Sequence, residues 1–178
     1  MKLVEAKQKK QLISIRSLYQ EAFPEQERKP FSLILQKRRR EQAEILAVEN
    51  EKNEFLGLAI TAKYQDMVLL DYFAVSKHQR SSGIGSKIFQ MLKQRHKEKR
   101  FFLEIESTQT LADNMEQRLK RKAFYLKNGM QKVPFLVNLR GIEMEILCAD
   151  CDLCFDEYWT LYHRIFGQNI SQHISMIK

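Results

Sequence analysis

The stretch from Leu69 to Gln90 constrains the fold of this chain more than any other, because three patterns follow one another within it. Leu69–Val75 is an apolar run of β-branched and aromatic residues with the length of a strand. Ser76–Ser82 is polar and cannot continue that strand. From Gly83 onward, apolar residues recur at the spacing of one helix face. The stretch therefore predicts a strand, a loop and a helix that begins at a glycine.

The first turn of this expected helix carries Gly83 and Gly85, so its main chain is nearly bare of side chains. Glycine lets a ligand come close to the backbone, and the first N–H groups of a helix have no partner inside it. These donors and the positive end of the helix dipole favour an anion, best of all a phosphate. Arg80 adds a positive charge beside them. We expect an anion-binding loop at this junction.

Two common glycine motifs do not fit the loop. The dinucleotide-binding motif needs a glycine directly after the strand and a third glycine, where this chain has Ile88. The nucleoside-triphosphate motif G-x-x-x-x-G-K-[ST] is absent from the sequence. The pattern that remains, R-x-x-G-x-G from Arg80 to Gly85, resembles the coenzyme A pyrophosphate loop of the GCN5-related N-acetyltransferases, the GNAT family. An ordinary helix opened by glycine is the alternative.

Composition indicates one folded domain, since the chain has 178 residues and 44% apolar content. No apolar run approaches the roughly 18 residues of a membrane span, and the start MKLVEAKQKKQ lacks the apolar centre of a signal peptide. We therefore expect a cytoplasmic protein with no membrane partner.

The net charge of +8 suits either nucleic acid or a polyphosphate cofactor. Because no nucleic-acid-binding signature is present, nucleic acid is not the expected partner.

Periodicity and turn residues predict the other elements. Strands are expected at 3–6, 45–48, 55–62, 69–75, 101–106, 133–138 and 142–148. Helices are expected at 12–23, 32–40, from 83 onward, at 115–126 and at 155–166. The tail after Gly167 has no clear pattern. Gly129 is expected to end the helix over 115–126 in a left-handed conformation.

Two further features carry the same resemblance. The order of the elements is that of the GNAT fold, and Ala123–Met130, AFYLKNGM, looks like the aromatic-Tyr-x-x-x-Gly ending of that family's fourth helix. The resemblance implies an α/β (α+β) fold: a mixed, mostly antiparallel sheet of six to seven strands, helices on both faces and an extra C-terminal helix. It also implies one acetyltransferase domain over residues 1–178, with a core at 1–148 and a helical extension at 149–178.

The resemblance further implies acetyl-CoA as cosubstrate and an amine-bearing acceptor, to which the acetyl group passes directly. The residues expected to bind the diphosphate of the cosubstrate are Arg80, Ser81, Ser82, Gly83, Ile84, Gly85 and Ser86. Those expected to offer their main chain to the pantetheine arm are Tyr72, Phe73, Ala74 and Val75. Asn114 is expected near the cofactor, although an exposed polar residue at a helix start is the alternative.

Acetyl transfer to an amine needs a base for the ammonium proton and benefits from an acid for the departing thiolate. Glu104 and Glu106 lie on one face of their expected strand, because side chains alternate along a strand. The resemblance implies that one of them is the base, with Glu104 as the first choice and Glu106 as the second. The alternative is that both side chains simply face solvent at the end of the strand. Tyr125 matches the family tyrosine that lies beside the cofactor and protonates the thiolate. The alternative is that the Tyr125 ring only packs on the core.

Cys148, Cys151 and Cys154 form a C-x-x-C-x-x-C pattern. Zinc and iron–sulfur sites use such spacing, usually with a fourth ligand and a second cysteine pair. Because the chain has no second pair and a cytoplasmic setting is expected, we expect reduced thiols and no metal.

Two other functions stay open at this point. A catalytically silent module would bind an acyl-CoA without transferring its acyl group. A basic RNA- or ribosome-associated protein would use Lys93–Arg100 and Arg118–Lys122. The apolar terminal helix, with Trp159, leaves a homodimer open as well.

Overall fold

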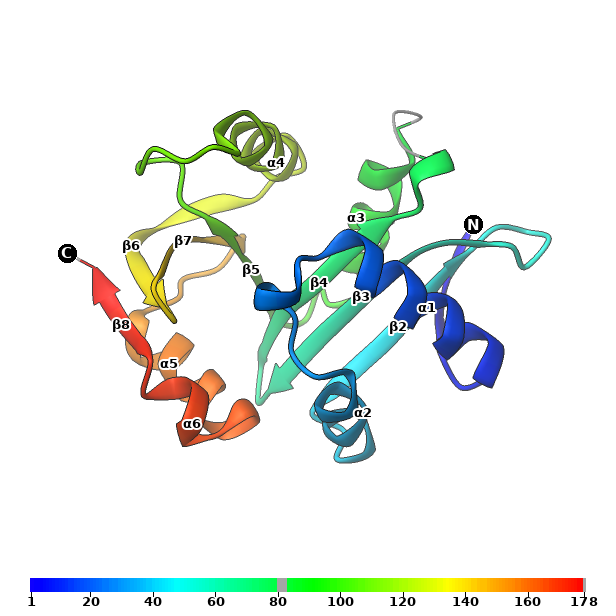
Figure 1. Ribbon diagram of the computed structural model, residues 1–178, viewed down its shortest axis with the longest axis horizontal. Coiled ribbons are helices and arrows are strands. Elements are labelled where there is room, and N and C mark those ends of the chain that lie inside the picture. Colours follow the sequence, from blue (N-terminus) through cyan, green and yellow to red (C-terminus); the bar gives the residue numbers. More distant parts are fainter. Residues whose placement is uncertain (80–82, 178) are drawn as a thin grey trace. The chain divides into compact units, whose positions relative to one another are not determined.

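The computed structural model describes residues 1–79 and 83–177 (Figure 1). The chain divides into two compact units. The first unit comprises Met1–Lys63 and Leu70–Arg95, and the second comprises Tyr64–Leu69 and His96–Lys178. Arg80, Ser81 and Ser82, which belong to the expected diphosphate loop, lie outside the described residues.

The first unit is built from strands and helices that follow the predicted order. Its elements are β1 (Lys2–Glu5), α1 (Lys9–Ala22), α2 (Phe31–Arg39), β2 (Ala43–Glu49), β3 (Phe55–Tyr64), β4 (Met67–Val75) and α3 (Ile84–Arg95). The last residue of β3 and the first three residues of β4 are counted with the second unit. The 3-10 turns Glu25–Glu27 and Lys77–Gln79 were not expected from the sequence. The strands follow the order β1-β2-β3-β4, and β1, β2 and β3 pair antiparallel.

Helices cover both faces of these strands, as the resemblance implied. Because side chains alternate along a strand, every second residue of β2, β3 and β4 reaches α1 and α2. The buried cluster on that face includes Ile15, Leu18, Tyr19, Ile34, Ile45, Ala47, Leu58, Ile60, Tyr72 and Ala74. The side chain of Phe73 on β4 lies on the opposite face of the strands, and its ring centroid is 6.1 Å from that of Phe89 on α3.

The second unit holds the remaining predicted elements and two that were missed. Its elements are β5 (Arg100–Glu106), α4 (Met115–Lys127), β6 (Gln131–Leu139), β7 (Ile142–Ala149), α5 (Phe155–Phe166), α6 (Gln168–Ser171) and β8 (Ile174–Ile177). The strands follow the order β5-β7-β6-β8, and each neighbouring pair is antiparallel. Gly129 ends α4 with φ of +83°, the left-handed conformation that was predicted.

The mixed, mostly antiparallel fold class is confirmed, but the strand count differs. The described residues hold eight strands, whereas six to seven were expected. The additional strand is β8, which pairs with residues 136–139 of β6. A strand of four residues is too short to show a clear alternation, and its formation depends on the partner edge that β6 offers. The tail after Gly167 therefore has regular structure that its sequence does not reveal.

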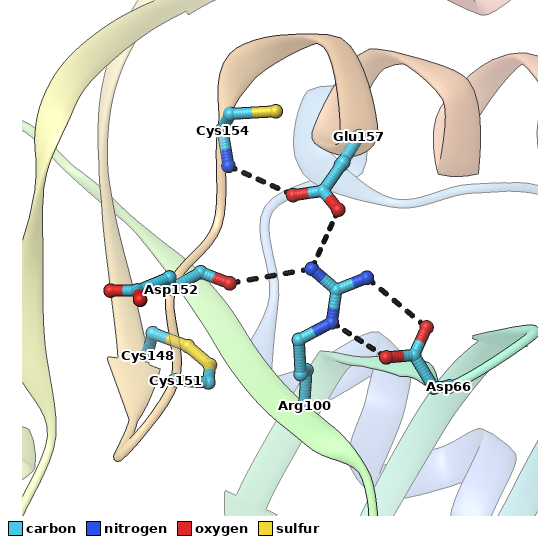
Figure 2. The surroundings of a disulfide bond; sticks show 7 residues. All are labelled: Asp66, Arg100, Cys148, Cys151, Asp152, Cys154 and Glu157. Atoms are coloured by element: carbon cyan, nitrogen blue, oxygen red, sulfur yellow. Dashed lines mark hydrogen bonds and ion pairs between the residues drawn. A yellow bond between two sulfur atoms is a disulfide. The ribbon is translucent and has the colours of Figure 1, made fainter.

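Arg100 holds the connection between β7 and α5 in place (Figure 2). Its Nε and Nη2 donate to the carboxylate of Asp66 at 2.7 and 3.1 Å. Its Nη1 donates to Glu157 at 2.7 Å and to the carbonyl oxygen of Asp152 at 3.3 Å. Hydrogen bonds from Arg100 lower the pKa of both the Asp66 and the Glu157 carboxyl groups. One guanidinium thus ties the start of β5 to the first turn of α5.

The cysteines depart from the expectation of reduced thiols, because Cys148 and Cys151 form a disulfide (Figure 2). Their Cα atoms lie 5.8 Å apart, within the range that a disulfide requires. Asp150 between them adopts a left-handed conformation with φ of +48°, which turns the chain back on itself. Spacing alone does not reveal that turn. Cys154 remains a free, exposed thiol.

The disulfide predicts a thiol count that changes with reduction. Protein denatured without reductant should show one reactive thiol per chain, and reduced protein should show three. Reduction should also lower the free energy of unfolding by about 2 kcal/mol, because it frees a short covalent loop in the unfolded chain. In the control variant Cys154→Ser both counts should fall by one. Three thiols in unreduced protein would contradict the pairing.

Candidate functional site

The described part of the expected anion-binding loop begins at Gly83, directly before α3. Gly83 adopts a left-handed conformation with φ of +73°, and α3 begins at the next residue. The N–H of Lys87 donates to the carbonyl oxygen of Gly83 at 3.3 Å. The N–H groups of Ile84 and Gly85 precede this bond, so they have no partner within the helix. The described part of the expected loop therefore presents main-chain donors at a helix start.

Charge at this helix start also suits an anion. The first turn of α3 carries no acidic residue, and its last turn carries Lys93 and Arg95. A helix of 12 residues has about half a positive charge at its N-terminus from the alignment of its peptide dipoles. The predicted binding residues Gly83, Ile84, Gly85 and Ser86 lie at that end of the helix.

The β4 residues expected beside the pantetheine arm differ in their surroundings. The hydroxyl of Tyr72 accepts from the N–H of Lys29 at 2.9 Å and donates to the carbonyl oxygen of Glu27 at 3.1 Å. Phe73 packs on α3, and Ala74 is buried. The side chains of Tyr72 and Phe73 are thus engaged inside the first unit, so a cofactor contact there would have to use the main chain.

A buried ion pair between β4 and the connection from α1 to α2 was not found from the sequence. Lys29 Nζ lies 2.6 Å from Asp71 Oδ1, and the side chains are only 13% and 5% exposed. The hydroxyl of Tyr19 donates to the carbonyl oxygen of Lys29 at 2.9 Å. These contacts fix residues 24–30 on β4. No sequence pattern indicated this ion pair.

In the second unit, Glu104 of β5 is held by two tyrosines. The hydroxyl of Tyr158 donates to Glu104 Oε2 at 2.6 Å, and the hydroxyl of Tyr162 donates to Glu104 Oε1. Both tyrosines belong to α5 and both are fully buried. Sequence reasoning missed them, since a contact across more than 50 residues leaves no local pattern.

Glu106 lies on the same side of β5 but in a different electrostatic environment. Arg118 and Arg121 of α4 donate to its two carboxylate oxygens at 2.7 and 3.1 Å. The side-chain amide of Asn114 lies 3.3 Å from both oxygens, and its carbonyl accepts from Arg118 at 2.7 Å. Both oxygens of Glu106 are thus held by side chains of α4, whereas the oxygens of Glu104 accept from side chains of α5.

Tyr125 lies near the end of α4 and is half-buried. Its ring packs at 5.2 Å against that of Phe124, with the two planes near perpendicular. Burial raises the pKa of Tyr125 to about 12, and the charge of Arg121 opposes this rise. The phenol therefore carries its proton at neutral pH and has one to donate.

A third carboxylate anchors α4 to the sheet. Glu145 of β7 is fully buried and accepts from Thr108 N and Oγ1 at 2.8 and 2.7 Å, and from Lys122 Nζ at 2.6 Å. Lys132 Nζ lies 3.4 Å away. Burial alone raises the pKa of this carboxyl, but the hydrogen bonds from Lys122 and Thr108 outweigh it and lower the pKa to about 2. Glu145 thus secures the helix that carries Tyr125.

Comparison with known sequences identifies the family. The sequence profile described as the acetyltransferase (GNAT) family matches residues 12–130, about two thirds of the chain. The chain therefore belongs to the GNAT family. It is an acyltransferase of the class that uses acetyl-CoA as cosubstrate and an amine as acceptor. No curated protein sequence matches the chain.

Solved structures share the fold. A GNAT-family protein from Bacteroides thetaiotaomicron is similar over 96% of this chain and 99% of its own, with 14% identity and a TM-score of 0.77. The spermidine N-acetyltransferase of Vibrio cholerae, solved with CoA and spermine, matches over 83% of this chain and 93% of its own, with 12% identity and a TM-score of 0.64. The aminoglycoside 6'-N-acetyltransferase of Enterococcus faecium covers 84% of this chain and 96% of its own, with 15% identity and a TM-score of 0.62.

Within residues 1–79 and 83–177, no helix is both long enough and apolar enough to cross a membrane.

The buried Glu145 predicts a loss of stability in acid. Its folded pKa of about 2 lies below the ordinary value of 4.5, so its contribution is complete above about pH 5 and is lost as the pH falls towards 2. This difference corresponds to about 3 kcal/mol in the free energy of unfolding. Urea unfolding should show Glu145→Gln much less stable than wild type at pH 7, with most of the gap closed at about pH 2.5.

Glu143→Gln is the matched control, because Glu143 lies on the same strand and accepts a bond from Thr110 at 3.1 Å in an exposed position. This control should differ little from wild type at either pH. A gap for Glu145→Gln that is equally large at both pH values would show that its carboxylate charge does not stabilise the fold.

Proposed function

We propose that this enzyme transfers the acetyl group of acetyl-CoA directly to a primary amine of a small molecule, peptide or protein, with no acetyl-enzyme intermediate. The observation that carries the proposal is the contrast between the two carboxylates of β5. Glu104 accepts from neutral phenols, whereas Glu106 faces two guanidinium groups. In this proposal Glu104 is the base, and Glu106 positions the start of α4.

Main-chain donors at the start of α3 would bind the diphosphate of acetyl-CoA. Gly83 supports this assignment through its left-handed conformation, and an added Cβ there would meet nothing within 4 Å. The predicted contacts of Arg80, Ser81 and Ser82 complete the loop in this proposal. The main chain of residues 72–75 would accompany the pantetheine arm.

The chemical step follows from the residue types. Glu104 takes a proton from the ammonium group of the acceptor, directly or through water, and the neutral nitrogen then attacks the thioester carbon. The new C–N bond forms as the C–S bond breaks, and the electron pair of that bond leaves on sulfur. Tyr125 donates its phenolic proton to this thiolate. Attack leaves the nitrogen positively charged, and it loses a second proton to solvent as the amide forms. Solvent also takes up the proton held by Glu104 and reprotonates Tyr125, so one net proton is released for each ammonium group acetylated.

Direct transfer is favoured by the state of the cysteines. A covalent intermediate would need a nucleophile such as a thiolate. Cys148 and Cys151 are bonded to each other, and Cys154 is the exposed N-terminal cap residue of α5. A mechanism with one displacement step needs none of them.

The proposal predicts that Glu104→Gln and Tyr125→Phe each lower kcat by about 100-fold or more while the affinity for acetyl-CoA stays within about twofold. Release of coenzyme A across a panel of primary amines, followed by chromatography, measures the first quantity, and calorimetry measures the second. Tyr64→Phe, a half-buried tyrosine at the end of β3, is the control and should keep wild-type turnover.

Two outcomes would contradict the proposal. Wild-type protein that binds acetyl-CoA but acetylates no amine would be a silent acyl-CoA-binding module. Undiminished turnover of Tyr125→Phe, with chemistry shown to limit the rate, would remove Tyr125 from the mechanism.

A further inference from the structure

The C-terminal helix α5 lies beyond residues 12–130, the part of the chain that matches the family, yet it reaches a residue of the proposed catalytic machinery. Tyr158 and Tyr162 are four residues apart, so they lie on the same face of α5. Each donates its hydroxyl to a different oxygen of Glu104. The extension therefore contributes directly to the environment of this carboxylate.

Packing restrains both phenols. The centroid of the Tyr158 ring lies 5.0 Å from that of Tyr162 and 6.3 Å from that of Phe102, which is on β5. The Tyr162 ring lies 5.2 Å from that of Phe166. Because side chains in a close-packed interior keep one rotamer, the two hydroxyl groups stay directed at Glu104.

The start of α5 is fixed as well. Glu157 accepts from the main-chain N–H of Cys154 at 3.1 Å and from Arg100 at 2.7 Å (Figure 2). The helix thus begins at a defined place, about one turn before Tyr158 and two turns before Tyr162. Arg100 is the first residue of β5. Its hydrogen bond to Glu157 therefore links β5, which carries Glu104, to α5, which carries the two tyrosines.

Two hydroxyl donors have a defined effect on a carboxylate. Hydrogen bonds to the charged form favour that form, whereas burial disfavours it. O–H donors to a carboxylate make short, strong bonds, and two such bonds from different directions also fix the plane of the group. The other carboxylate on this face of β5, Glu106, is paired with Arg118 and Arg121 instead.

We propose that Tyr158 and Tyr162 are positioning residues for Glu104: they keep its carboxylate ionised and hold it in one orientation, so that the extension completes the acid–base machinery. The catalytic part of this statement rests on the proposed function, in which Glu104 is the base. The alternative is purely structural, with Glu104 serving only to satisfy two buried phenols.

The test removes one hydroxyl at a time in Tyr158→Phe and Tyr162→Phe, which keep the aromatic packing. Loss of a donor favours the protonated carboxyl. The acidic limb of the kcat/KM profile should therefore move to higher pH by roughly one pH unit for each hydroxyl removed. The titration midpoint of the Glu104 carboxyl carbon, followed by NMR and assigned with Glu104→Gln, should move by the same amount.

Trp159→Phe is the matched control on the same helix. Its indole N–H donates to the carbonyl oxygen of Ser171 at 3.1 Å and makes no bond to Glu104. This variant perturbs α5 but should leave both the pH profile and the NMR midpoint at wild-type values. If either tyrosine variant unfolds, the other single variant carries the test.

The two readouts separate the failure of this inference from the failure of the proposed function. Folded tyrosine variants with unchanged NMR midpoints and unchanged pH profiles would overturn the inference and leave acetyl transfer intact. A shifted midpoint together with full activity of Glu104→Gln would overturn Glu104 as the base, while supporting the tyrosines as the groups that hold it ionised.

Discussion

The left-handed backbone of Gly83 is the constraint on which the proposed cosubstrate site depends. With φ of +73°, it ends the loop after β4 and allows α3 to begin at the next residue. A residue with a Cβ would be strained in that conformation even though the space around it is open. The first N–H groups of α3 and the positive end of its dipole follow from this start. We propose that the helix start that this glycine allows binds the diphosphate of acetyl-CoA.

Three carboxylates of the second unit show how one functional group takes different roles. Glu145 is buried, hydrogen-bonded to Lys122 and Thr108, and secures α4. Glu106 is paired with two arginines of the same helix. Glu104 meets two neutral phenols from α5. We propose that the two carboxylates paired with basic side chains of α4 anchor that helix, and that Glu104, held by two tyrosines of α5, serves as the base.

The sequence revealed those parts of the molecule that local patterns encode. The strand, loop and helix around Gly83 and the left-handed end of α4 at Gly129 are local, and both were predicted. The contacts of Glu104 with Tyr158 and Tyr162 join residues 54 and 58 positions apart, so no spacing reveals them. The disulfide depends on the turn at Asp150, and β8 depends on an edge of β6. These three features depend on tertiary contacts, which local sequence patterns do not encode.

The most direct measurement is the affinity of coenzyme A for wild type and for Gly83→Ala, determined by calorimetry beside pantetheine, which lacks the diphosphate. An alanine at this position meets no neighbour within 4 Å, so the substitution changes the backbone preference alone. We expect coenzyme A to bind the variant at least about tenfold more weakly, with pantetheine unaffected and the free energy of unfolding lowered by about 1 kcal/mol. Equal affinity of coenzyme A for both proteins would show that the start of α3 does not hold the diphosphate.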